Sequence, residues 1–134
     1  MLVVDTNVLA YLLIESAETP LARRVLTADP EWAAPILWRS EFRNLLATYI
    51  RHSRMLLADA MGYFRDAEKF VLGREHLGDS RIILSLAHES GRSAYDCEFV
   101  AVAKDLRVPL VTNDRKLRAS FPETAISPEE FVSS

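Results

Sequence analysis

The stretch that decides the fold is Met1-Leu-Val-Val-Asp-Thr-Asn-Val8, in which a short apolar run leads into three polar residues. Residues 1–4 are apolar and rich in valine, which is typical of a buried strand. The three polar residues are helix-capping types, and the apolar run from Val8 to Ile14 predicts a helix directly behind them. A strand followed by a cap and a helix is the opening unit of an α/β fold.

The same arrangement recurs near the other end of the chain. Pro109-Leu-Val-Thr112 predicts a second strand, and Asn113-Asp114 predicts the cap of a short helix that ends near Ala119. Between the two strands, spacing and capping residues predict helices at about 19–26, 35–52, 53–71, 79–90 and 93–106, short strands at 32–34 and 124–126, and a turn at 73–78. This alternation predicts one α/β domain, residues 1–134, around a short, mainly parallel sheet.

Composition excludes several classes of protein. With 49% hydrophobic and 26% charged residues in 134, the chain is globular and not disordered. Its one cysteine, Cys97, excludes an internal disulfide and a cysteine-clustered zinc site. The longest apolar run has seven residues, whereas a bilayer needs about 20. We therefore expect a soluble, cytoplasmic protein with no membrane partner.

Charge alone does not decide whether the chain binds nucleic acid. The net charge is −3, which is unusual for such a protein. However, most of the 16 basic residues are arginine, the side chain that grips phosphate in bidentate fashion. If four carboxylates belong to one metal site, the other residues carry a net charge of +1.

Three acidic residues lie at predicted strand ends or helix starts. Asp5 and Asp114 directly follow the two clearest strands, and parallel strands bring their carboxyl ends to one edge of the sheet. Either residue also fits a simple N-cap. Asp96 falls on the apolar side of the helix 94–106, near its positive end. It equally fits a capping box with Ser93.

Glu41 has no such simple explanation. It lies six residues after Pro35, too deep in the predicted helix for a cap, and on the flank of the apolar stripe. A carboxylate buried there needs a cation, which is either an arginine partner or a metal ion.

Taken together, the four acids point to a metal site. Two carboxylates about 4 Å apart repel by about 4 kcal/mol at an effective dielectric constant of 20. A cluster of them is stable only if protons or a divalent cation neutralise it. Oxygen ligands of this kind suit Mg²⁺ or Mn²⁺ better than zinc.

Four motifs, in this order and spacing, carry a family resemblance: Val3-Val-Asp-Thr-Asn-Val8, Ser40-Glu-Phe-Arg-Asn-Leu-Leu46, Tyr95-Asp-Cys-Glu-Phe-Val-Ala-Val-Ala103 and Leu110-Val-Thr-Asn-Asp-Arg-Lys-Leu117. On these motifs the chain resembles the PIN-domain nucleases, and specifically the VapC-type toxins of prokaryotic toxin–antitoxin pairs. The resemblance implies a three-layer α/β/α sandwich. It also implies a homodimer and a small antitoxin partner that blocks the site, with the helices at 19–28 and 54–72 as the expected partner surface.

The resemblance also assigns site residues. It makes Asp5, Glu41, Asp96 and Asp114 the catalytic, metal-binding acids, with Asp5 and Asp96 as the principal ligands. It places Thr6, Asn7, Asn44 and Thr112 in supporting positions. Arg115, Lys116 and Arg118 are candidates for contact with the RNA backbone, or else form a solvated helix face. Glu98 is expected on the solvent side of its helix.

The function implied is that of a metal-dependent endoribonuclease. The acids would hold one or two Mg²⁺ or Mn²⁺ ions, and metal-activated water would attack an RNA phosphodiester in line, leaving a 5′-phosphate and a 3′-hydroxyl. A metal-free route through the ribose hydroxyl would need paired histidines, which the spacing of His52, His76 and His88 does not suggest. The alternative is a PIN-fold module that binds RNA or protein without cutting.

Overall fold

A computed structural model describes all 134 residues. Its centre is a five-stranded sheet in the order β3-β2-β1-β4-β5, and every neighbouring pair is parallel. The strands are β1 (Leu2–Val4), β2 (Trp32–Pro35), β3 (Glu75–His76), β4 (Leu110–Val111) and β5 (Ala125–Ile126). The predicted strands at 1–4, 32–34, 109–112 and 124–126 are thus confirmed, and β3 is an addition to them.

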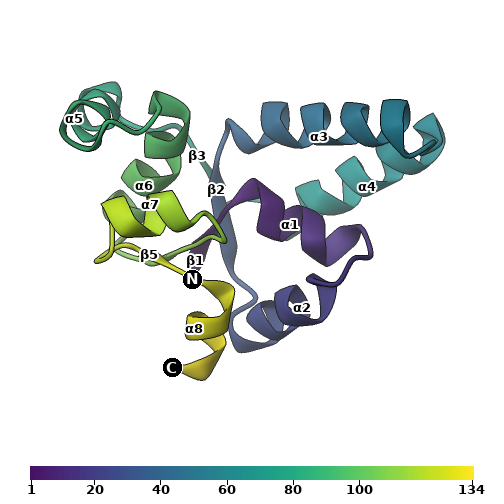
Figure 1. Ribbon diagram of the computed structural model, residues 1–134, viewed down its shortest axis with the longest axis horizontal. Helices are drawn as coiled ribbons and strands as arrows, with labels where there is room; N and C mark the ends of the chain where they lie inside the picture. The colour runs from purple at the N-terminus through teal and green to yellow at the C-terminus, as the bar shows by residue number, and fades with distance from the viewer.

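Eight helices cover the sheet: α1 (Thr6–Leu13), α2 (Thr19–Ala28), α3 (Trp38–His52), α4 (Leu57–Phe70), α5 (Ser80–Ser90), α6 (Ala94–Leu106), α7 (Arg115–Ser120) and α8 (Pro128–Ser133). Figure 1 shows α5, α6 and α7 on one side of the strands and α1 to α4 on the other. The chain therefore forms the predicted α/β/α sandwich. No helix combines the length and the apolar character needed to cross a membrane.

The central strands are buried because both of their faces are covered. Every residue of β1 and β4 is at most 1% exposed. Residues of β1 pair with β4 in the register Val3 to Leu110 and Val4 to Val111. This register places the residue after β1, Asp5, beside the residue after β4, Thr112. The fold thus brings together two positions more than 100 residues apart in sequence.

Two predicted helix boundaries are wrong. Pro35 does not open a helix but ends β2, where the missing N–H of proline is tolerated, and α3 begins at Trp38. Ser53 does not cap α4 but ends α3, because its N–H donates to the carbonyl of Tyr49. The next residue, Arg54, has φ of 57°, which turns the chain away from the helix.

Two short elements were not predicted. The predicted turn at 73–78 contains β3, whose Glu75 accepts hydrogen bonds from the Arg39 guanidinium and the Trp38 indole. These contacts fix a segment whose own residues have little preference for strand. Helix α8 begins at Ser127-Pro128, where the Ser127 hydroxyl accepts the N–H of Glu130. Its capping signal is present in the sequence.

Candidate active site

The candidate site lies where the strand order of the sheet reverses. From β1 the chain leads to helices on one side of the sheet, and from β4 it leads to α7 on the other side. In open parallel sheets this reversal leaves a crevice beyond the carboxyl ends of the two strands. A pocket of about 390 Å³ occupies this place, lined by Asp5, Thr6, Asn7, Glu41, Asn44, Leu45, Asp96 and Asp114.

The pocket therefore contains all four predicted acids and three of the four predicted supporting residues. The acids come from four separate places in the chain: the end of β1, the first turn of α3, the first turn of α6 and the start of α7. No lysine or arginine lines the pocket. Only Leu45 among the lining residues was not predicted, because an apolar side chain carries no chemical signal in the sequence.

Thr112, the fourth supporting residue, lies behind the pocket and fixes one of the acids. Its hydroxyl is fully buried and donates to Oδ2 of Asp5 at 2.6 Å. The hydroxyl oxygen of Thr112 in turn accepts the backbone N–H of Asp114 at 3.0 Å. Because the hydroxyl oxygen accepts the N–H of Asp114, the hydroxyl hydrogen remains free to donate to Asp5. Thr112 thus positions Asp5 and links it to the backbone N–H of Asp114.

The capping alternatives differ between Asp5 and Asp114. Asp5 occupies the N-cap position of α1, but its side chain makes no capping hydrogen bond. Asp114 does cap α7, since its Oδ1 accepts the N–H of Leu117 at 3.0 Å. The side chain of Asp114 is exposed, and the same residue lines the pocket. Capping therefore explains Asp114 in part and does not explain Asp5.

Glu41 has no arginine partner. The only hydrogen bond of its carboxylate comes from the hydroxyl of buried Thr6, which donates to Oε1 at 2.7 Å. No basic group lies within 4 Å of its carboxylate. Because α3 begins at Trp38, Glu41 lies in the first turn of the helix and not deep inside it. The salt-bridge alternative is therefore wrong, and the carboxylate remains without a compensating cation.

Asp96 lies in the first turn of α6, as predicted. The Ser93 hydroxyl accepts the backbone N–H of Asp96 at 3.0 Å, so half of the expected capping box is formed. Its half-buried side chain lines the pocket. Glu98 is also half-buried, and its negative charge raises the pKa of Glu41. The expectation that Glu98 lies on the solvent side is therefore wrong. No local sequence signal shows that this part of α6 faces Glu41.

The electrostatics of the pocket disfavour four ionised carboxylates. Burial raises the pKa of Asp5, Glu41 and Asp96 above the ordinary values. Repulsion adds to this effect, since the charge of Asp114 raises the pKa of both Asp5 and Asp96. The hydrogen bonds from Thr112 to Asp5 and from Thr6 to Glu41 act in the opposite direction.

The donor set suits a hard divalent cation, although the side chains do not form a complete cage. Carboxylate, amide and hydroxyl oxygens line the pocket, which are the ligands that Mg²⁺ and Mn²⁺ prefer. No three His, Cys, Asp or Glu side chains are placed so that they could hold one ion together. Mg²⁺ is usually held by one or two carboxylates, with water and substrate phosphate completing its shell. The pocket therefore fits an ion of this kind.

The three predicted RNA-binding residues are not equivalent. Arg115 and Lys116 are exposed on α7, directly after Asp114. The guanidinium of Arg118 is half-buried and donates to the Thr112 carbonyl at 2.9 Å. Arg118 therefore supports the loop that carries Thr112, and Arg115 and Lys116 keep their charges free in solvent.

Comparison with known proteins identifies the family. The PIN domain family matches residues 2–120, nearly the whole chain. The chain belongs to the PIN domain family. Members of this family are generally nucleases, which agrees with an acidic pocket at the sheet edge. No curated protein sequence matches this PIN domain.

Solved structures of low sequence identity share the fold. PAE2754 from Pyrobaculum aerophilum has a TM-score of 0.78 and 23% identity, covering 98% of this chain and 93% of its own. A toxin–antitoxin complex from Klebsiella pneumoniae has a TM-score of 0.72 and 18% identity, covering 96% and 98%. FitAcB from Neisseria gonorrhoeae has a TM-score of 0.70 and 18% identity, covering 96% and 99%. At these identities the likeness concerns the fold of this PIN domain.

Proposed function

We propose that this PIN domain is a metal-dependent endoribonuclease and the toxin of a toxin–antitoxin pair, acting in the cytoplasm. The observation that carries the proposal is the convergence of four carboxylates from four chain segments in one pocket without any basic residue. Such an arrangement costs stability unless a cation offsets it. A chemical role at the strand ends explains why four carboxylates are placed together in spite of this cost.

Asp5 and Asp96 would be the principal holders of Mg²⁺ or Mn²⁺, with Glu41 and Asp114 beside them. When bound, the ion supplies a Lewis acid that activates water and offsets charge on the phosphate. Thr112 keeps Asp5 in one orientation. Thr6 orients Glu41, whose raised pKa suits it to take a proton from the attacking water. Attack at phosphorus breaks the bond to the 3′ oxygen, which leaves with a proton as the 3′-hydroxyl of the upstream fragment, and the downstream fragment keeps the phosphate at its 5′ end.

Cleavage of RNA tests the proposal. The purified chain is incubated with structured and unstructured RNAs in Mg²⁺, Mn²⁺ or EDTA. We expect cleavage that needs the metal, is lost in Asp5→Asn and Asp96→Asn, and survives in the control Asp105→Asn. Asp105 is exposed on the same helix as Asp96, outside the acidic pocket. Metal-dependent cleavage that persists in both site variants would refute the site.

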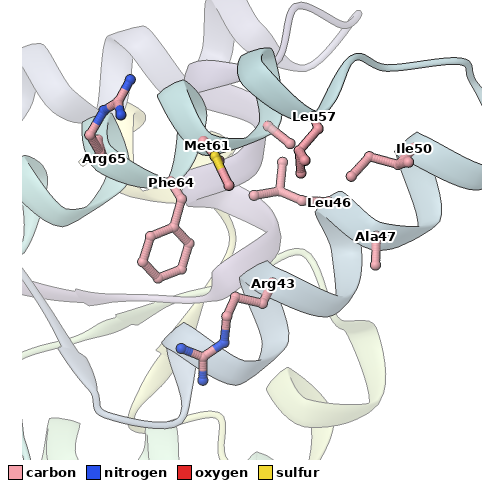
Figure 2. A pocket seen from close by; sticks show the side chains of 9 residues that line it. Arg43, Leu46, Ala47, Ile50, Leu57, Met61, Phe64 and Arg65 are labelled. Carbon is pink, nitrogen blue, oxygen red and sulfur yellow. The ribbon is translucent and has the colours of Figure 1, made fainter.

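An antitoxin surface is proposed on the hairpin of α3 and α4, where an apolar groove of about 420 Å³ opens to solvent. Figure 2 shows apolar side chains of both helices meeting in it, with Arg43 and Arg65 beside them. Leu57 is 61% exposed and Met61 is 54% exposed. We propose that an apolar segment of a small antitoxin with acidic residues fills the groove, its carboxylates pairing with the two arginines.

Two findings bear on this surface. The Klebsiella relative of this fold is a toxin–antitoxin complex, which makes an antitoxin the favoured occupant. The predicted surface on α2 is not supported, because none of its large apolar side chains is exposed. We expect a small protein encoded beside this gene to co-purify with the chain, and Met61→Asp to abolish this. Leu84→Asp, at a 64% exposed position on α5, is the control. Co-purification that survives Met61→Asp would contradict the proposal.

The second candidate function is a PIN-fold module that binds without cutting. In that case the acids would have no chemical role, and neutralising them would leave RNA or protein binding intact. Absence of cleavage with every RNA, in protein shown to be free of antitoxin, would favour this function. Homodimerisation stays a prediction, which the mass of the purified chain in analytical ultracentrifugation tests.

A further inference from the structure

Arg92 is the half-buried arginine that stands apart from the others. Its Nε atom is buried and has no hydrogen-bond partner, and its guanidinium makes no ion pair in the fold. The other half-buried arginines are satisfied. Arg39 pairs with Glu75 and Glu68, Arg74 donates to the carbonyls of Trp32 and Phe70, and Arg118 donates to the carbonyl of Thr112.

The backbone around Arg92 is firmly held, so its position is a property of the fold. Gly91 ends α5 with φ of 72°, and its N–H donates to the Ala87 carbonyl at 2.9 Å. The N–H of Arg92 donates to the Ser90 hydroxyl at 3.0 Å. The following residue, Ser93, caps α6 by accepting the N–H of Asp96. Arg92 therefore lies directly before the N-cap of α6, four residues ahead of Asp96 in the sequence.

The charge of Arg92 acts on Asp96, although the two side chains form no ion pair. It lowers the pKa of Asp96, against the opposing effects of burial and of Asp114. However, no nitrogen of Arg92 lies within 4 Å of the Asp96 carboxylate. A half-buried cation without a partner costs stability, and an anion that enters beside it would offset this cost.

A cation beside the pocket would favour the binding of a phosphodiester there. Its four carboxylates repel a phosphodiester, and no basic side chain lines it. Guanidinium groups bind phosphate oxygens through a planar pair of donors. We propose that Arg92 binds a backbone phosphate of the RNA next to the scissile bond. This inference rests on the proposed ribonuclease function and assigns to it a substrate-binding residue outside the four acids.

The test separates substrate binding from a structural role. A fluorescent single-stranded RNA is titrated in Ca²⁺, and anisotropy gives the Kd at several salt concentrations. We expect Arg92→Met to weaken binding by about 3- to 10-fold and to lower the slope of log K against log salt by about 0.7, the value for one phosphate contact on single-stranded nucleic acid. Arg92→Lys should keep most of the slope. Arg81→Met, at an exposed position on α5, should change neither quantity.

Thermal unfolding provides the second readout. Because Arg92 has no hydrogen-bond or ion-pair partner to lose, we expect the Tm of Arg92→Met to be unchanged or higher. A clear drop in Tm, or an unchanged Kd and salt slope, would overturn the inference. If the unsubstituted protein bound no RNA at all, the proposed function would fail, and with it the inference. If it bound and cleaved RNA while Arg92→Met bound equally well, only the inference would fail.

Discussion

Replacing Thr112 by valine tests how the fold holds the first acid of the site. The substitution keeps the shape of a buried side chain and removes a hydroxyl that bonds both Asp5 and the N–H of Asp114. A hydrogen bond to a charged group contributes about 1.5–3 kcal/mol, and a neutral one contributes about 1 kcal/mol. We therefore expect Thr112→Val to lower the free energy of unfolding by about 2.5–4 kcal/mol.

This loss converts into a measurable temperature. An unfolding entropy of about 2.1 cal/mol/K per residue gives about 0.28 kcal/mol/K for this chain, so the Tm should fall by about 9–14 °C. Thr112→Ser is the matched control. It keeps the hydroxyl, loses one methyl group, and should cost about 1 kcal/mol or about 3–4 °C. Differential scanning calorimetry at pH 7 in EDTA measures both variants.

The pH dependence adds a second check on the same contact. The hydroxyl donates to the carboxylate form of Asp5, so the penalty of Thr112→Val should shrink as acid protonates that group. If Thr112→Val were as stable as Thr112→Ser at pH 7, the hydroxyl would not hold Asp5, and the reasoning about the site would be refuted.

Three further predictions follow from the same structure. In EDTA, the free energy of unfolding should fall as pH rises from about 4 towards the raised pKa values of the buried acids, because the folded state binds more protons than the unfolded state in this range. Thermal scans of Asp96→Asn should show a weaker pH dependence. Mn²⁺ at about 100 times its Kd should raise the free energy of unfolding by about 2.7 kcal/mol, and a Tm unaffected by Mn²⁺ would count against a metal site. Gly91→Ala should lower the free energy of unfolding by about 1–2 kcal/mol because φ is 72° at this position, whereas Gly62→Ala within α4 should raise it by about 0.5–1 kcal/mol. Denaturant unfolding measures both variants.

The sheet and two of the acids could be predicted because their signals are local. Asp5 and Asp114 follow short apolar strands, and parallel strands bring such residues to one edge. The start of α3 was misplaced because a proline after two alanines fits a helix start as well as a strand end. Only the pairing of β2 with β3 decides between these alternatives.

The connections within the site could not be predicted, because they depend on non-local packing. The bond between Thr112 and Asp5 requires the register of β1 against β4 across more than 100 residues. The closeness of Glu98 to Glu41 and the unpartnered state of Arg92 depend on how the start of α6 meets its neighbours. Nothing in the local sequence specifies these contacts.

Binding of Mn²⁺ tests the central claim most directly, because it asks whether the acidic pocket holds a divalent cation. Electron paramagnetic resonance of free Mn²⁺ measures binding to the unsubstituted chain and to the variants Asp96→Asn and Asp105→Asn. We predict that the unsubstituted chain and Asp105→Asn bind Mn²⁺ alike and that Asp96→Asn binds at least about 10-fold more weakly. Absence of Mn²⁺ binding, or equal binding by Asp96→Asn, would contradict the account.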